Sequence, residues 1–379
     1  MSHELEAHAG RRWTTGRVLE VFGPLLALAV LVGVTAAFNS RFLLPENLLN
    51  VVEDLSFRGV IAVGMTFVII LGGIDLSVGS LVAFAGGLGI WLMNTVINAA
   101  PILKAAADAQ QFKMEAPYSI VRVWLAHAFT WTHMGGSEVW GVLMAFAVIL
   151  AAGTAAGLLN GVLIAKGRIA PFIATLGGLA AYRSLALALA DGGEFRSASA
   201  DLFKGLGTGG IRLPYLTNQY GNPLMLRWPV LIFIACVAAA WIVLSRTRYG
   251  RYVYAIGSNE RAALYSAIAV DRVKIVTYSL IGLLTGVAAM MNASRMNSVS
   301  SGQTGSMWEL DAIAAVVIGG TRMTGGAGGV WGTLVGLLIL GVIGNMLNLL
   351  QVSPYLQGLV KGAIIVAAVL LQRGRRAEQ

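Results

Sequence analysis

The stretch ILGGIDLSVGSL, residues 70–81, places a carboxylate and two hydroxyls inside one of the most apolar parts of the chain. A charged side chain is expensive in membrane hydrocarbon and usually faces a protein interior, a polar path or a partner charge. Asp75 could carry a proton, line a path with Ser77, or form half of an ion-pair gate. It could also serve the fold alone, because aspartate caps helix starts well and the preceding Gly72–Gly73 permits a sharp turn. We favour this capping role.

Two further carboxylates, Glu309 and Asp311, stand at the start of another apolar run. Because they are two positions apart on a helix, their side chains point in directions about 200° apart around the axis and cannot act as one paired site. We expect them to stabilise a helix start through its dipole. The alternative is contact with a soluble partner at the rim of a transport path. Asp75, Ser77, Glu309 and Asp311 are therefore the candidate residues of a translocation path or gate.

Recognisable catalytic and nucleotide-binding motifs are missing from the sequence. There is no G-x-x-x-x-G-K-[ST] phosphate loop and no G-x-S-x-G elbow, and HELEAH (3–8) misses the H-E-x-x-H spacing by one residue. The four histidines fall in pairs that cannot share a helix face, and the single Cys236 excludes a cysteine-based zinc site. We expect no enzyme activity, no metal and no cofactor in this chain by itself.

The composition indicates a membrane protein. The 379 residues are 57% hydrophobic and only 12% charged, whereas a soluble domain carries about 25% charged residues. Apolar runs of about 20 residues, the length of a membrane-spanning helix, recur along the chain. The net charge of +9 fits basic loops on the cytoplasmic side, so we expect no nucleic-acid partner.

These runs predict an all-α, polytopic protein with about ten transmembrane helices and both termini in the cytoplasm. The expected spans are 18–38, 52–73, 76–98, 138–160, 170–190, 228–245, 275–292, 309–320, 330–350 and 355–372. The eighth is short for a crossing and is either extended by preceding residues or a broken helix buried in protein. A tight turn at 74–75 separates the second and third.

The predicted organisation is a cytoplasmic N-tail (1–17), one transmembrane domain (18–372) and a cytoplasmic C-tail (373–379). Segments 99–137 and 191–227 are expected on the periplasmic side, and the loop 246–274 on the cytoplasmic side. Fifteen of the 27 Lys and Arg residues fall in the segments that this arrangement places inside. That asymmetry is the positive-inside pattern and supports the orientation.

Glycines spaced four apart occur as pairs within three of the predicted spans. The pairs are Gly153 and Gly157, Gly282 and Gly286, and Gly332 and Gly336. Each pair puts two glycines on one helix face, which lets a neighbouring helix approach closely. We interpret them as packing sites within the domain.

The loop 246–274 contains a segment, 257–268, that is predicted to form a short helix. Ser258 or Asn259 can cap it, and Glu260 suits its positive end. It carries too little apolar surface to be stable alone and needs a docking surface. One interpretation is a basic helix lying on lipid; because its side chains are small, we favour a peg that enters a cleft in a soluble partner.

Five stretches together resemble the permease subunits of bacterial ribose-, xylose- and galactose-type ABC importers. They are GMTFVIILGGIDLSVGSLVAFAGG, APFIATLGGLAAYRSLAL, RTRYGRYVYAIGSNERAALYSAI, ELDAIAAVVIGGTRMTGG and VSPYLQGLVKGAIIVAAVLLQ. The resemblance covers roughly residues 45–372. It implies a multi-pass protein of the inner membrane that forms the path for a monosaccharide by alternating access.

The same resemblance implies partners and a coupling site. A second permease copy, a cytoplasmic ATPase that binds ATP and Mg²⁺, a periplasmic sugar-binding protein and membrane lipid would surround this chain. The family's coupling helix corresponds to 257–268. The residues expected to couple to the ATPase are Gly257, Ser258, Asn259, Glu260, Arg261, Ala262, Ala263 and Tyr265.

Two departures from the family pattern stand out. The family commonly has Ser-Gly-Ile where this chain has Ser266-Ala267-Ile268, and the alanine would be strained if that position needs a positive φ. The segment 99–137 is longer than in the shortest members; it could touch the binding protein, but we expect it to pack over the outer surface.

The rival function is a proton- or sodium-coupled secondary carrier that uses Asp75 and Glu309. The sequence does not specify which sugar is carried.

Overall fold

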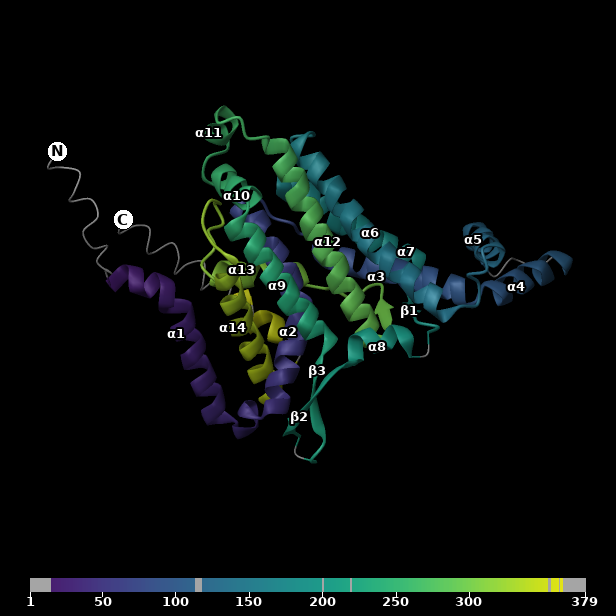
Figure 1. Ribbon diagram of the computed structural model, residues 1–379, viewed down its shortest axis with the longest axis horizontal. Coiled ribbons are helices and arrows are strands. Elements are labelled where there is room, and N and C mark those ends of the chain that lie inside the picture. Colours follow the sequence, from purple (N-terminus) through teal and green to yellow (C-terminus); the bar gives the residue numbers. More distant parts are fainter. Residues whose placement is uncertain are drawn as a thin grey trace.

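In the computed structural model, the chain is described over residues 15–112, 118–199, 201–218, 220–353, 356–360 and 362–363. Most of it forms helices that run obliquely side by side (Figure 1). Helices α10 (Arg248–Ser258) and α11 (Glu260–Tyr265) mark one end of the molecule. The hairpin of strands β2 (Gly210–Thr217) and β3 (Pro223–Arg227) marks the opposite end. We call these the α10–α11 end and the hairpin end.

The body of the molecule is built from apolar helices, most of them long. They are α1 (Thr15–Phe38), α2 (Pro45–Ile70), α3 (Val78–Ile97), α6 (Glu138–Ala165), α7 (Pro171–Leu189), α9 (Trp228–Arg246), α12 (Val270–Met296), α13 (Trp308–Ile318) and α14 (Val330–Leu349). Proline stands in the first turn of α2, α7 and α9, where a missing N–H costs nothing. A single 3₁₀ turn, η2 (Ser40–Leu43), joins α1 to α2.

These helices confirm the predicted all-α polytopic fold. Within the described residues, six of them are long and apolar enough to cross a membrane: α3, α6, α7, α9, α12 and α14. Helix α2 has 26 residues but carries charges near its start, and α13 has only 11 residues, about half of a crossing. The tails 1–17 and 373–379 and the tenth predicted span, 355–372, lie wholly or largely outside the described residues.

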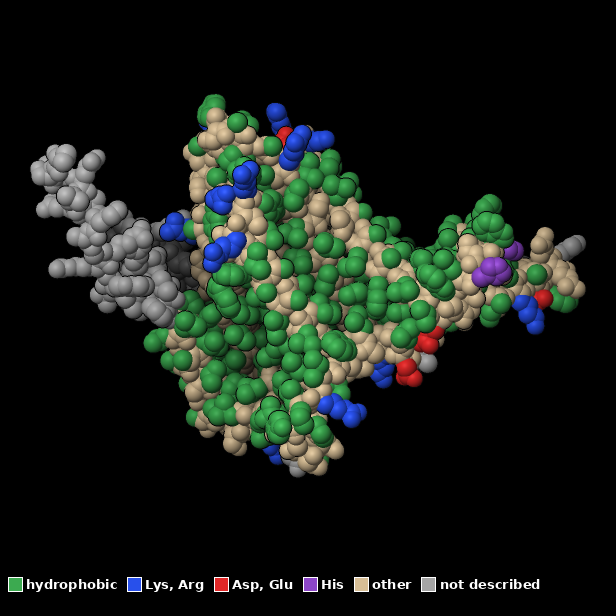
Figure 2. Space-filling model, in the orientation of Figure 1, with side chains coloured by type: hydrophobic (Ala, Val, Ile, Leu, Met, Phe, Trp, Pro, Cys, Tyr) green, Lys and Arg blue, Asp and Glu red, His purple; other side chains and the backbone are tan. Residues whose placement is uncertain are grey.

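The outer surface is also that of a membrane protein. Figure 2 shows hydrophobic side chains spread over the flank of the helices, while lysine and arginine gather toward the α10–α11 end. Large apolar side chains on the outside of the helices remain exposed, among them Leu26, Ile173 and Ile234 at 65%, 61% and 53%. Such a surface suits lipid and not water.

Glycine contacts hold the helices of the body together, as the spacing predicts. A Cβ at Gly153 would lie 2.5 Å from the carbonyl oxygen of Gly282, and one at Gly157 would lie 2.2 Å from that of Tyr278. The α6 pair therefore packs directly against the backbone of α12. The third pair behaves in the same way toward α13, where a Cβ at Gly336 would lie 2.0 Å from the carbonyl oxygen of Ala315.

The connections at the hairpin end add small elements that the all-α prediction does not include. Strand β1 (Glu194–Arg196) pairs antiparallel with β4 (Ser298–Ser300), with Phe195 opposite Val299. Strands β2 and β3 form the second two-stranded sheet, and α8 (Leu202–Thr208) lies between the two. They belong to the predicted outside segment 191–227 and to the connection that leads into α13.

The predicted outside segment 99–137 forms two helices, α4 (Ala99–Gln111) and α5 (Ile120–Trp131). The expectation that it packs over the outer surface is wrong. The two helices pack on each other and extend sideways from the point where α3 ends and α6 begins (Figure 1). We call this pair the α4–α5 arm.

Candidate functional site

The connection between α2 and α3 is a buried break. Helix α2 ends at Ile70 and α3 begins at Val78, so the predicted tight turn at 74–75 is wrong and a longer non-helical stretch replaces it. Gly72 adopts a φ of 91°, which confirms the predicted glycine turn. Its neighbour Gly73 approaches the hydroxyl of Tyr278, to which a Cβ would come within 2.4 Å. Non-helical backbone at membrane depth is tolerated only where protein or a polar cavity surrounds it.

Asp75 joins this break to the start of α3 through a chain of hydrogen bonds. Its Oδ1 accepts from the backbone N–H of Ser77 at 2.8 Å and from the Ser77 hydroxyl at 2.6 Å. The amide of Asn160 on α6 donates to the same hydroxyl at 3.0 Å. The predicted cap is therefore wrong in detail: Ser77 is the N-cap, and Asp75 forms an Asx turn two residues earlier. Both Asp75 and Ser77 are buried.

A second turn meets α3 at the same level. After β4 the chain folds back through residues 301–307 into the half-length α13. Arg183 on α7 holds this turn, since its Nη1 donates to the carbonyl oxygens of Ser301 at 2.7 Å and Thr304 at 3.1 Å. No local sequence pattern specifies this contact, because the groups it joins are more than a hundred positions apart.

The turn brings Glu309 against the first turn of α3. A Cβ at Gly79 would lie 2.1 Å from a carboxylate oxygen of Glu309 and 2.3 Å from the carbonyl oxygen of Gly305. Three of the four candidate path residues, Asp75, Ser77 and Glu309, therefore surround the start of α3. The N-termini of α3 and α13 meet there, and both present partial positive charge.

Asp311 points elsewhere and belongs to a different cluster. Its Oδ2 lies 3.3 Å from Nη1 of Arg58 on α2, and the same arginine lies 3.7 Å from Asp54. The Arg58 guanidinium also sits 5.9 Å from the ring centroid of Trp308. The structure thus separates Asp311 from Glu309, as their angular spacing on a helix requires.

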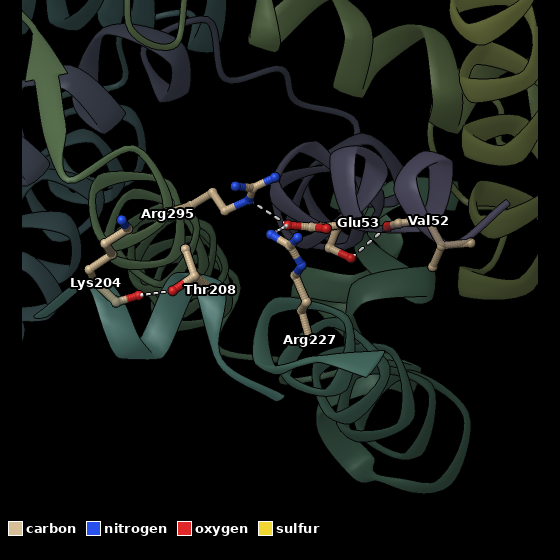
Figure 3. Close-up of polar contacts among 7 residues, drawn as sticks. Val52, Glu53, Lys204, Thr208, Arg227 and Arg295 are labelled. Carbon is tan, nitrogen blue, oxygen red and sulfur yellow. Dashed lines mark hydrogen bonds and ion pairs between the residues drawn. The ribbon is translucent and has the colours of Figure 1, made fainter. Parts of the chain in front are cut away.

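The buried carboxylate of Glu53, which was not among the predicted site residues, lies between Arg227 and Arg295 (Figure 3). Its side chain is 6% exposed and pairs with Arg227 at the end of β3, 3.2 Å away, and with Arg295 in the last turn of α12. The sequence pattern gives little indication that Glu53 is buried, because this residue falls at the edge of the predicted second span. The cluster ties α2, α12 and the β2–β3 hairpin together by charge-assisted hydrogen bonds.

At the other end of the molecule, the predicted short helix is present with narrower bounds than 257–268. The chain forms α10 and α11, which meet at Asn259. The side-chain oxygen of Asn259 accepts from the N–H of Ala262 at 3.0 Å, which confirms its capping role. Glu260 is in the first turn of α11 and pairs with Lys274 of α12 at 2.7 Å.

The predicted coupling residues divide into an exposed and a packed set. Ser258, Asn259, Glu260, Arg261, Ala262 and Tyr265 are exposed, with Tyr265 at 88%. Ala263 is buried at 4% and seats α11 on its own chain. Gly257 packs on the end of α2, where a Cβ would lie 1.8 Å from the carbonyl oxygen of Ile70. Leu264, 61% exposed, joins the outward surface and was not among the predicted residues.

Helix α10 is held to the helices behind it by two tyrosines. The Tyr249 and Thr277 hydroxyls are 2.7 Å apart, and the Tyr254 hydroxyl donates to the carbonyl oxygen of Gly328 at 2.8 Å. Burial raises the pKa of Tyr249 to about 12, against an opposing effect of the hydrogen bond to Thr277. The exposed tip of α11 therefore stands on an α10 that is fixed to the helices behind it.

A buried helix break, a half-length helix and a set of helices long and apolar enough to cross a membrane define a polytopic membrane protein. The family described as branched-chain amino acid transport system / permease component matches residues 47–369, and the chain belongs to this permease family. Its family places it in the inner membrane as a multi-pass protein.

Curated relatives match nearly the whole chain. The ribose import permease protein of Escherichia coli K12 is 36% identical over 97% of this chain and 98% of its own length. That of Bacillus subtilis 168 is 38% identical over 95% of each chain. The xylose transport system permease protein of Escherichia coli K12 is 28% identical over 93% of this chain and 91% of its own. No solved structure matches the chain.

Proposed function

We propose that this chain is the membrane-spanning subunit of an ATP-driven importer of a monosaccharide. The observation that carries the proposal is the match of nearly its whole length to ribose import permeases. The importer would contain a second permease copy, a cytoplasmic ATPase that binds ATP and Mg²⁺, and a periplasmic sugar-binding protein. The chain itself supplies the path and no catalytic group. The relatives named for ribose, L-arabinose, D-allose and xylose include both pentoses and a hexose, so the proposed substrate class is a monosaccharide.

Coupling would run from the exposed tip of α11 into the membrane domain. In this proposal the tip docks on the ATPase through Glu260, Arg261 and Tyr265. A push on the tip would reach α12 through the Glu260–Lys274 pair. It would also reach the end of α2 through Gly257, which has no side chain to absorb the movement. Alternating access would follow as these two helices shift relative to the second copy.

We place the sugar path at the start of α3. Asp75, Ser77 and Glu309 lie there with the N-termini of two helices, and hydroxyl-rich ligands need such hydrogen-bonding groups. A neutral sugar needs partners for its hydroxyls and no counter-charge. Asp311 lies to the side of this path, paired with Arg58.

The test of the proposed function is assembly with the ATPase encoded with this chain. Charge reversal at the tip, Glu260→Lys with Arg261→Glu, should abolish co-purification of the ATPase. The matched control reverses an exposed acid–base pair at the hairpin end, Glu194→Lys with Arg196→Glu, and should leave it intact. Equal binding by both variants would contradict the docking role of α11.

A second experiment separates the importer from a gradient-driven carrier. In vesicles that hold the full complex, sugar uptake should require ATP on the side of the α10–α11 end. Uptake driven by a proton or sodium gradient without nucleotide would overturn the proposal and favour the secondary carrier with Asp75 and Glu309 as its ion-binding groups.

A further inference from the structure

Helix α5 of the arm exposes one continuous apolar face. At about 100° per residue, positions 120, 121, 124, 128 and 131 share a face about 100° wide. Ile120, Trp124 and Trp131 on this face are 76%, 75% and 85% exposed, and Val121 is 58% exposed. His127 lies at its edge. The charged side chain of α5, Arg122, points the other way, so this face carries no charge.

The opposite face of α5 fixes the arm to the body. Ala126 is fully buried between α4 and α5 with Ile102. The Arg122 guanidinium lies 5.0 Å from the ring centroid of Tyr118 and 5.8 Å from that of Trp91 on α3. Its Nε also donates to the hydroxyl of Thr95 at 3.1 Å. With Arg122 held by three groups, the direction of the apolar face is set by the structure.

The apolar face of α5 points back toward the part of the molecule that would cross the membrane. In Figure 1 α5 lies on the side of α4 that faces the α10–α11 end, and α4 lies on the side of the hairpin end. Helix α4 presents polar groups outward, including the exposed Lys104 and Asp108. Figure 2 shows the same division, with hydrophobic side chains along the upper edge of the arm and charged ones along its lower edge. The arm is apolar on one side and polar on the other.

The surface at which the arm rejoins the body is apolar as well. The arm rejoins the body at the first residues of α6, where Val139, Trp140 and Leu143 are 55%, 41% and 51% exposed on a membrane-spanning helix. Trp124 and Trp131 on this face and Trp140 at the start of α6 are all exposed. Tryptophan is enriched at membrane–water interfaces, where its ring is buried and its N–H stays hydrated.

We propose that α5 is an interfacial helix that lies in the lipid headgroup region at the hairpin end, with Ile120, Val121, Trp124 and Trp131 inserted between acyl chains. The occupant of this face is lipid. The arm widens the membrane footprint of the permease and holds α4 and its polar side above the surface. Lipid is favoured over a soluble partner because the face itself carries no charged side chain and because tryptophan suits the membrane–water interface.

The test is site-directed spin labelling of the full chain in lipid nanodiscs. The native cysteine is first removed by Cys236→Ala, and labels are then attached at Val121→Cys, Ala128→Cys and, as the control on α4, Asp108→Cys. Collisions with oxygen report lipid, and collisions with a water-soluble nickel chelate report solvent. We expect labels at 121 and 128 to favour oxygen several-fold over the chelate, and the label at 108 to favour the chelate.

Two results would overturn the proposal. Equal access of the chelate to positions 121 and 108 would mean that α5 faces water. Protection of position 121 from both reagents would mean that a protein, such as a second copy of this chain, covers the face. A second variant tests the tryptophans themselves: Trp124→Lys with Trp131→Lys should move the label at 121 into reach of the chelate. A label that stays in lipid would show that these side chains do not anchor the helix.

Discussion

Glu53 on α2 forms an ion pair with Arg295, which lies 242 positions further along the chain. The same carboxylate oxygen accepts from Arg227 at 3.2 Å (Figure 3). One nearly buried acid thus bonds two arginines on separate elements. Because a buried charge is tolerated only when paired, the three side chains stabilise the hairpin end as a unit.

We expect Glu53→Ala to destabilise the protein by about 3–5 kcal/mol, because it leaves two partly buried arginines without their counter-charge. Chemical unfolding in detergent measures this. The control is the next residue, Asp54→Ala, whose side chain is 66% exposed and 3.7 Å from Arg58; a surface pair of this kind contributes about 0–1 kcal/mol. Similar losses in both variants would show that the Glu53 cluster is not a structural unit.

A second prediction concerns the contact between α6 and α12. Gly157→Ala places a methyl group 2.2 Å from the carbonyl oxygen of Tyr278, where backbone cannot give way. The helices must separate, and we expect a loss of about 1–3 kcal/mol in the free energy of unfolding. The control Gly177→Ala lies on α7 with nothing within 4 Å of the added atom, so it should be neutral or stabilising by up to about 1 kcal/mol. A neutral Gly157→Ala would contradict the close packing.

The glycine pairs illustrate how far the sequence predicts this fold. Apolar length gives the helices, and glycine spacing gives the faces on which they approach. Spacing does not name the partner, so the match of Gly153 and Gly157 with Gly282 and Gly286 emerges only in three dimensions. The same limit applies to the charged residues. Glu53 pairs with arginines on elements that local periodicity cannot place beside it.

The sequence predicts the candidate site only in part: it indicates the helix start but not the contacts around it. A carboxylate after two glycines indicates a helix start, and the structure has one there. The sequence does not distinguish a cap from an Asx turn, because both use the same side-chain oxygen and differ by where α3 begins. Glu309 meets Gly79 only because the chain folds back before α13, and no local pattern specifies that turn.

A third prediction concerns Ala267, which has a φ of 60°. The N–H of Ile268 donates to the carbonyl oxygen of Ala263 at 3.1 Å, the bond that closes a helix with a left-handed residue. Since a Cβ costs about 1 kcal/mol in this conformation, Ala267→Gly should slow amide exchange across α11 several-fold. Ala262→Gly, inside the same helix, should speed it. Slower exchange in neither or both variants would contradict strain at Ala267.

A fourth prediction follows from the raised pKa of Tyr249, about 12 against an ordinary 10.0. The folded state holds the phenol proton more tightly than the unfolded state does. This contribution to stability is therefore complete below pH 10 and is lost as the pH rises toward 12. Relative to Tyr249→Phe, the unaltered protein should lose about 1–3 kcal/mol over that window. Tyr252→Phe, an exposed position on the same helix, serves as the control. Parallel curves of stability against pH for the unaltered protein and Tyr249→Phe would contradict the prediction.

The last prediction separates charge from hydrogen bonding at Asp75. Asp75→Asn keeps a side-chain oxygen that can accept from the N–H and hydroxyl of Ser77, so unfolding should change by less than about 1 kcal/mol. Asp75→Leu removes that acceptor, leaves a buried N–H unpaired, and should cost about 1–3 kcal/mol. A neutral sugar does not need the charge, so ATP-driven uptake by Asp75→Asn in vesicles should stay close to that of the unaltered complex. Abolished uptake by a normally assembled Asp75→Asn complex would show that the carboxylate charge itself takes part in transport.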